Sequence, residues 1–119
     1  MNAYLVDFYS DLDTPYKIYY LFADSFQDVF KKIKESDRKD LLCIKEIPLF
    51  QEPETITGPE VGIYYFDIIP SLKFKFPQKT IGVLAETIDL AFSFINSCMD
   101  EDSKIIEFSL GEQKLSYYS

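Results

Sequence analysis

Residues 3–22 read AYLVDFYSDLDTPYKIYYLF, and this stretch predicts the structural class of the whole chain. Apolar side chains occupy every second position in both of its arms, which is the spacing of strands with one buried face. The segment between the arms, residues 10–15, combines turn-forming side chains with a proline that fixes the backbone angle φ. The stretch therefore predicts an antiparallel β-hairpin. The alternating residues are Tyr4, Val6 and Phe8 in one arm and Ile18, Tyr20 and Phe22 in the other.

The rest of the chain adds two helices and more strands. Ser25 provides an N-cap, and apolar residues then recur three and four positions apart, which predicts a helix over residues 25–35. Helices do not alternate with single strands, which disfavours a doubly wound parallel sheet. We therefore expect an α+β fold: a mostly antiparallel β-sheet in the order ββαβββαββ with two α-helices packed on one face. The later segments are strands at 41–47, 61–69 and 72–76, a loop at 51–60, a helix at 80–99 and a hairpin at 104–118.

The two C-terminal segments carry specific expectations. The apolar arc of the predicted helix at 80–99 spans about 220° when successive residues are placed about 100° apart. That is wider than packing on one sheet face needs, so the helix is either buried on a second side or meets a partner. In the predicted hairpin, Gly111-Glu112 suits a two-residue type II′ turn, which places Phe108 opposite Leu115 and Ile106 opposite Tyr117.

Composition excludes several chemistries. The chain has 119 residues, which indicates one domain over residues 1–119, and it shows no internal repeat or linker. It contains no histidine, which excludes Ser-His-Asp and Cys-His catalysis and histidine-based metal sites. Cys43 and Cys98 are too few for a four-cysteine zinc site, and we expect them to be reduced and buried; a single disulfide in a secreted protein is the alternative. We expect no cofactor, no metal and no enzymatic activity.

The charge indicates the kind of partner. Twenty acids against 12 bases give a net charge of −8, which disfavours direct nucleic-acid binding and attachment to an anionic membrane. No signal peptide and no stretch able to span a bilayer stand out, which favours a cytoplasmic location. The expected partner is another protein with a basic surface, and a homodimer is a second option.

Three acidic loops and one tyrosine pair are the candidate partner-binding residues. The loops fall in predicted connections, where side chains are exposed, and tyrosine is enriched at protein interfaces. The alternative is that the acids form ordinary solvated faces and that the tyrosines pack at the rim of the core. The candidates are Asp11 and Asp13; Glu52, Glu54 and Glu60; Asp100, Glu101 and Asp102; and Tyr64 and Tyr65.

These observations favour a small acidic protein that inhibits or neutralises another macromolecule. The class expected is a bacterial toxin-immunity protein or a phage-borne antagonist of a defence nuclease, such as an anti-CRISPR protein. A self-assembling structural or adaptor domain is the alternative, because the wide helical arc and the open hairpin edges offer surfaces for association. A hydrolase that uses paired carboxylates ranks last, because no spacing singles out one pair.

Overall fold

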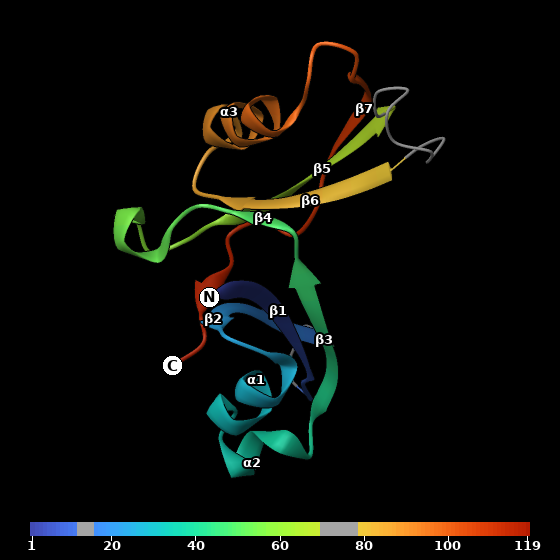
Figure 1. Ribbon diagram of the computed structural model, residues 1–119. Helices are drawn as coiled ribbons and strands as arrows, with labels where there is room; N and C mark the ends of the chain where they lie inside the picture. The colour runs from blue at the N-terminus through green and yellow to red at the C-terminus, as the bar shows by residue number, and fades with distance from the viewer. Residues whose placement is uncertain (12–15, 70–78) are drawn as a thin grey trace.

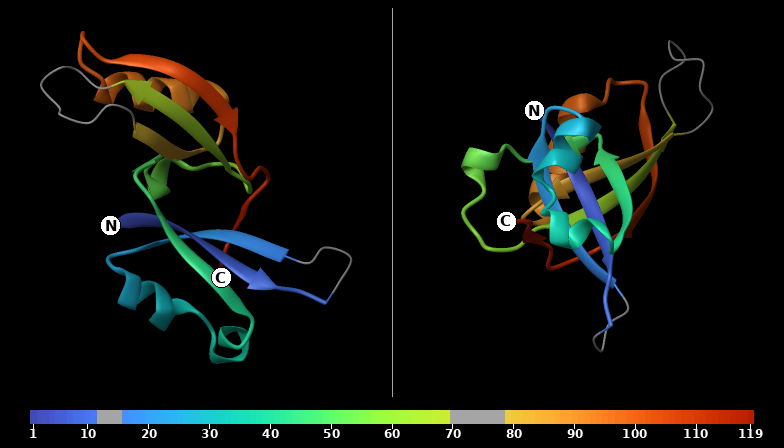
Figure 2. Two further views of the ribbon diagram at one scale, coloured as in Figure 1. Left: turned by 90° about the vertical axis from the view of Figure 1, so that its right-hand side faces the viewer. Right: turned by 90° about the horizontal axis from the view of Figure 1, so that it is seen from below.

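The computed structural model describes residues 1–11, 16–69 and 79–119, and these residues form a four-layered α+β fold. Two four-stranded, mostly antiparallel sheets pack face to face, and helices cover the outer face of each (Figure 1). The view turned by 90° about the vertical axis shows the same layering (Figure 2, left). The predicted class is confirmed, but the strands form two sheets instead of one, and the helices lie on opposite outer faces.

The first sheet has the strand order β3-β1-β2-β8, and the second has the order β4-β6-β5-β7. The predicted strand at 72–76 lies outside the described residues. In the described part of the chain, no helix is both long enough and apolar enough to cross a membrane. The elements are β1 (Asn2–Tyr9), β2 (Tyr16–Ala23), α1 (Phe26–Lys32), α2 (Glu35–Arg38), β3 (Leu41–Ile47), β4 (Leu49–Phe50), η1 (Pro53–Thr55), β5 (Gly62–Ile69), β6 (Lys79–Ala85), α3 (Ile88–Cys98), β7 (Lys104–Leu110) and β8 (Ser116–Tyr117).

The predicted hairpin at 3–22 is confirmed as β1 and β2, which pair antiparallel along their whole length. Alternation along β1 sends Tyr4, Val6 and Phe8 toward the helical layer. The opposite face of the hairpin carries Leu5 and Tyr20, which lie in the core between the two sheets. Both faces of the first sheet are therefore covered, one by helix and one by the second sheet.

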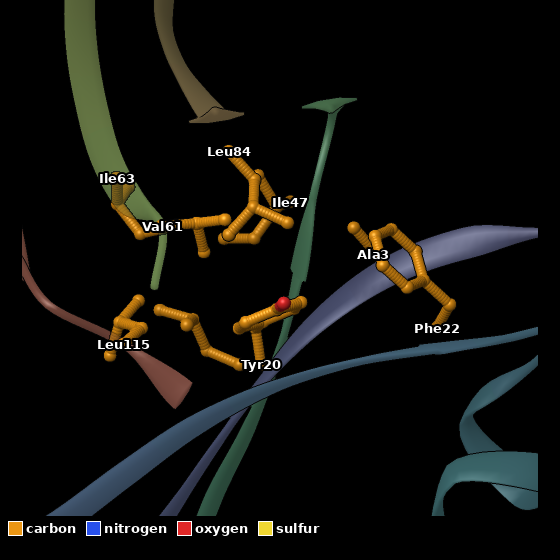
Figure 3. Close-up of a cluster of buried hydrophobic side chains, with 9 residues drawn as sticks. Ala3, Tyr20, Phe22, Ile47, Val61, Ile63, Leu84 and Leu115 are labelled. Carbon is orange, nitrogen blue, oxygen red and sulfur yellow. The ribbon is translucent and has the colours of Figure 1, made fainter. Parts of the chain in front are cut away.

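Three clusters of buried side chains match the three interfaces between the four layers. One cluster packs the first sheet against α1, and another packs the second sheet against α3. The third lies between the sheets (Figure 3). Side chains from both sheets meet in this third cluster, so neither sheet has a core of its own on its inner face. Its residues are Ala3, Leu5, Tyr20, Phe22, Ile47, Val61, Ile63, Leu84 and Leu115.

The chain contains two copies of one ββαβ unit. The first repeat (residues 2–47) contains β1, β2, α1 and β3, and the second repeat (residues 62–110) contains β5, β6, α3 and β7. In each repeat the first strand lies between the second and the last strand and is antiparallel to both. The register with the last strand also shifts directly after an aspartate in each, Asp7 and Asp67. The expectation of no internal repeat is therefore wrong.

The helix beginnings show the same correspondence in sequence. Residues 23–26 read ADSF and residues 85–88 read AETI, so an alanine and an acid precede a hydroxyl N-cap in both repeats. Ser25 accepts the N–H of Asp28, and Thr87 accepts the N–H of Leu90. The repeat was missed because only a few positions agree and because the predicted helix at 80–99 concealed β6, the counterpart of β2.

The strand that follows each repeat along the chain joins the sheet of the other repeat. β3 continues through Pro48 into β4, which pairs parallel with β6 of the second sheet. β7 is followed by β8, which crosses back and pairs parallel with β2 of the first sheet. Both sheets therefore have an edge strand from the other half of the chain, which ties the two repeats together.

The predicted helix at 80–99 is wrong over its first third, where the chain forms β6. Val83 and Ala85 pack toward α3, whereas Leu84 packs into the core between the sheets. A strand that is buried on both faces has no polar positions, so its sequence joins that of α3 in one long apolar pattern. This explains the wide apolar arc without a partner surface.

The predicted hairpin at 104–118 is also wrong, because β7 pairs with β5 instead of β8. Phe108 lies opposite Phe66, not Leu115, and Leu115 bridges to Val61. Gly111 does not form a hairpin turn. Its N–H donates to the carbonyl of Ile63 at 2.8 Å, so the chain continues alongside β5.

The two cysteines are exposed and unbonded, in contrast to the expected burial. Cys43 lies on β3, an edge strand of the first sheet, and Cys98 lies in the last turn of α3. Neither cysteine belongs to any of the three buried clusters. No disulfide contributes to this fold.

Candidate functional site

The three acidic loops lie in three separate parts of the molecule (Figure 1). Asp11 follows β1, the loop with Glu52, Glu54 and Glu60 lies between β4 and β5, and residues 100–102 follow α3. Asp13 lies outside the described residues. All of the described acids in these loops are exposed. The loops therefore do not form one common docking surface, and each has to be considered alone.

The tyrosine pair is divided by strand alternation. Tyr64 is 5% exposed and packs among the residues under α3, so its ring is not accessible to a partner. Tyr65 points to the opposite face, where it is half-buried beside the core between the sheets. Its hydroxyl accepts a hydrogen bond from Lys45 Nζ at 3.3 Å. Both rings thus have packing roles in the second sheet.

The loop at residues 51–60 is held in a defined shape by side chains. Gln51, the one buried polar residue in the described part of the chain, donates from Nε2 to Glu86 Oε1 at 2.9 Å and to the carbonyl of Thr55 at 3.2 Å. The N–H of Glu86 in turn donates to Gln51 Oε1 at 3.0 Å. This reciprocal pair fixes the start of the loop to the end of β6.

The carboxylate of Glu86 fixes the middle of the same loop. Its two oxygens accept the N–H groups of Thr57 and Gly58 at 2.9 and 3.0 Å. These backbone hydrogen bonds, assisted by the amide of Gln51, hold the pKa of Glu86 below its ordinary value. The charged carboxylate is therefore the form that stabilises the loop, and Glu52, Glu54 and Glu60 are presented on a preorganised backbone.

An apolar groove runs beside this loop. It encloses about 320 Å³ between the loop and the first sheet. Tyr20 and Phe22 of β2 form its floor, Pro53 and Ile56 form its loop wall, and Tyr117 of β8 closes one side. Edge-to-face packing of Tyr117 on Tyr20, with ring centroids 5.4 Å apart, fixes that side. None of the three loop glutamates lines the groove itself, but they stand exposed on the loop that forms its wall, and we call the groove together with this loop the acidic groove. Met1, Lys32 and Gly58 complete its lining.

The acidic groove has three glutamates on its loop and two bases in its lining, Lys32 and the terminal amine of Met1. Lys32 is already engaged by the carbonyl of Phe22 at 2.9 Å and by Asp28 at 3.6 Å, and the Met1 amine lies 3.8 Å from Asp24. Within the described residues, none of the three loop glutamates has an ion-pair partner, and the two ion pairs found there both join residues of the first 32. The groove thus combines an apolar floor with carboxylates that carry uncompensated charge.

A second, more polar cavity lies at the far end of the first sheet. It encloses about 420 Å³, and Asp11, Asp40, Lys17 and Lys34 contribute charges of both signs to its wall. The hydroxyl of Tyr118 donates to Asp37 at 2.6 Å and accepts the N–H of Lys34 at 3.0 Å. Burial, followed by the hydrogen bond to Asp37, raises the pKa of Tyr118. This network joins β8 to α2, so its hydrogen bonds serve the fold.

The acidic groove offers apolar contacts in its lining and carboxylates on its loop. Residues 1–11, 16–69 and 79–119 contain no cluster of three metal-binding side chains. Sequence reasoning identified its three glutamates but missed Gln51, Glu86 and Tyr117. The signal available for Glu86 was its place directly before a hydroxyl N-cap, where an acid is common. Nothing local indicates that it binds a loop 28 residues earlier.

Comparison with known proteins adds no relative from which a role could be inferred. No protein-family model, curated protein or solved structure matches the chain. The geometry of the acidic groove is therefore the basis for assigning a function.

Proposed function

We propose that this protein is a non-enzymatic binding protein that docks on a basic macromolecule through its acidic groove and neutralises it. The proposal rests on one observation: a loop that is fixed by hydrogen bonds lies beside the apolar floor of the groove. Glu52, Glu54 and Glu60 stand on a backbone fixed by Glu86 and Gln51, beside a groove large enough for an apolar side chain. Preorganised charge around an apolar anchor site is the arrangement that gives specific, electrostatically assisted docking.

The distribution of charge supports a basic partner. Residues 1–45 hold eight acids and seven bases, whereas residues 46–119 hold 12 acids and five bases. Nearly all of the net charge of −8 therefore belongs to the part of the chain that carries the acidic loop. A net negative charge over this part attracts a basic surface from a distance.

The proposal includes the class of protein. A small acidic chain that occupies the basic site of another macromolecule acts as an inhibitor. Toxin-immunity proteins and phage-borne antagonists of defence nucleases, such as anti-CRISPR proteins, act in this way, and we place the protein in that class with a cytoplasmic site of action. The alternative of a self-assembling domain has lost one support, because the wide apolar arc belongs partly to β6.

The test is capture of partners from a bacterial lysate by the tagged protein at low and at high salt. We expect one stoichiometric basic protein, retained at low salt and released at high salt. Replacing the loop carboxylates in the triple variant E52Q/E54Q/E60Q should abolish retention. The matched control is E101Q/D102N/E107Q, which removes three exposed charges of the second half outside the groove and should retain the partner.

Two results contradict the proposal. One is a partner whose retention is the same for the loop variant and the wild type at both salt concentrations. The other is capture of no protein except the chain itself, which favours self-assembly. If a partner is captured, it is purified, and inhibition is measured as loss of the partner's activity when the acidic protein is added.

A further inference from the structure

A second apolar groove lies on the opposite side of the first sheet, between α1 and β3. It is a shallow hollow of about 440 Å³, and we call it the α1–β3 groove. Phe26 and Phe30 of α1 are 48% and 46% exposed along one wall, and Ile44 of β3 forms the other. Two half-exposed phenylalanines on one short helix leave apolar surface in water, which marks an interaction site. Gln27 and Lys31 complete the lining.

In the second repeat, the place that corresponds to this groove is filled by aromatic side chains. Phe92 of α3 corresponds to Phe30 and packs edge-on against Phe66, with ring centroids 4.9 Å apart. It also packs at 5.1 Å against Phe108 of β7. The first repeat has Val6 and Ile44 in place of these two phenylalanines, as the strand registers show. The smaller side chains leave the space that an aromatic ring occupies in the other repeat.

The groove borders an open sheet edge. β3 is the outermost strand of the first sheet and has seven residues, whereas the opposite edge strand, β8, has only two. The outward N–H and C=O groups of an edge strand are free to pair with a further strand. A segment added beside β3 would send every second side chain over Ile44 into the groove.

The charges at the groove differ from those of the protein as a whole. Lys31 lines it, and the guanidinium of Arg38 lies 4.4 Å from the centre of the Phe30 ring. Arg38 donates from Nη2 to the carbonyl of Phe30, and its buried Nε has no hydrogen-bond partner in the described part of the chain. Glu46 lies two residues beyond Ile44, at the other end. The end near α2 therefore favours an acidic group, within a chain whose net charge is −8.

We propose that the α1–β3 groove docks an extended segment of a partner protein, which adds to β3 as a strand. The segment carries an aromatic anchor that enters between Phe30 and Ile44. An aspartate or glutamate two positions away lies on the same face and meets Lys31 and Arg38. The anchor follows from the filled groove of the second repeat, and the acid follows from charge complementarity. This site is separate from the acidic groove and has the opposite charge preference.

A library of random octapeptides displayed on phage tests this site on the intact protein. Selection is made on the wild type, with counter-selection on Ile44→Phe, which introduces the phenylalanine that the second repeat has at this place. We expect the enriched peptides to share an aromatic residue with an acid two positions away. Bound peptide should also slow hydrogen exchange of the β3 amides, as strand addition requires.

Single variants then identify the contacts. Ile44→Phe and Lys31→Glu should each weaken a selected peptide by about tenfold or more, since each affects a central contact. Ile88→Ala is the matched control, because Ile88 is the exposed counterpart of Phe26 in the second repeat, and it should leave binding unchanged. Thermal unfolding of all three variants checks that they are folded.

Several outcomes would overturn the proposal. They are selection of no peptide, selection of basic peptides, and equal binding to the wild type and the folded Ile44→Phe variant. A fourth is self-association of the wild type that Ile44→Phe abolishes, because a second copy of the chain would then be the occupant. Loss of the basic partner in the E52Q/E54Q/E60Q variant concerns the other groove and leaves this result unaffected.

Discussion

Two corresponding residues have different contacts in the two repeats. Asp24 and Glu86 each directly precede the N-cap of a helix. The Asp24 side chain is 83% exposed and lies 3.8 Å from the terminal amine of Met1, a weak surface ion pair. Glu86 instead accepts two backbone N–H groups and the amide of Gln51. The carboxylate that holds the loop at residues 51–60 therefore comes from the second repeat, and Asp24 has no such role in the first.

The hydrogen bonds of Glu86 make the acidic loop sensitive to acid. Its pKa is lowered in the folded protein, so its contribution to stability is full above the ordinary value of 4.5 and is lost as the pH falls through the lowered pKa. We expect the protection factors of the Thr57 and Gly58 amides, which correct for the slower intrinsic exchange at low pH, to fall in that range. Glu86→Gln should show fast exchange already at pH 7, whereas the exposed control Asp89→Asn should behave like the wild type. Equal protection in Glu86→Gln would show that the carboxylate does not hold the loop.

At the scale of single elements, Tyr65 on the inner face of the second sheet packs between two glycines. Its ring lies between Gly82 of β6 and Gly111, which follows β7. A Cβ on Gly82 would lie 3.2 Å from the ring, and a Cβ on Gly111 would overlap the ring on its other side. Because both sides are occupied, the ring has little room to move away. Gly111 is thus required by this close approach and not by a turn.

We expect Gly111→Ala to destabilise the protein by about 1–3 kcal/mol, as an overpacked site does. Urea unfolding measures the change. The double variant Gly111→Ala/Tyr65→Leu should cost less than the sum of its single variants, because the smaller side chain relieves the overlap. Strict additivity would mean that the effect of Gly111→Ala does not come from Tyr65.

Local patterns were sufficient for some elements and insufficient for others. The hairpin of β1 and β2 follows from alternation and turn residues. The strand β3 follows from an apolar run that ends at Pro48, β5 from its aromatic and β-branched residues, and the loop at residues 51–60 from its prolines and glycine. β6 does not, because burial on both faces removes the polar positions that distinguish a strand from a helix. The partners of β7 and β8 were also missed. They lie far earlier in the chain, at Phe66 and Tyr20, and no local pattern specifies such long-range pairing.

At the scale of the whole molecule, the exchanged strands join the two repeats around one shared core. Leu115 lies in the core between the sheets and bridges to Val61 on the way to β8. The acidic groove depends on the same crossing, because Tyr117 of β8 forms one of its sides. Sequence predicted the acids of this groove from their loop. Its apolar half remained unpredicted, because Tyr20, Phe22 and Tyr117 come together only in the assembled fold.

Truncating Leu115 should therefore destabilise both repeats. We expect Leu115→Ala to lower the free energy of unfolding by about 2–5 kcal/mol, the usual cost of a cavity in a core. Hydrogen exchange should show the same loss of stability in β3 and in β7. The exposed control Leu110→Ala, at a position 61% exposed, should change stability by less than about 0.5 kcal/mol. A loss confined to one repeat would mean that the two halves unfold independently.

The return of β8 to the first sheet also constrains synthesis on the ribosome. β2 emerges early, but the strand that covers its edge is formed by residues 116–117. Until these residues emerge, the nascent chain exposes the open edge of β2 and an inner sheet face that lacks the second sheet. An open strand edge is a site of aggregation, so chaperone contact during translation should concentrate on the first repeat, although that repeat is made first.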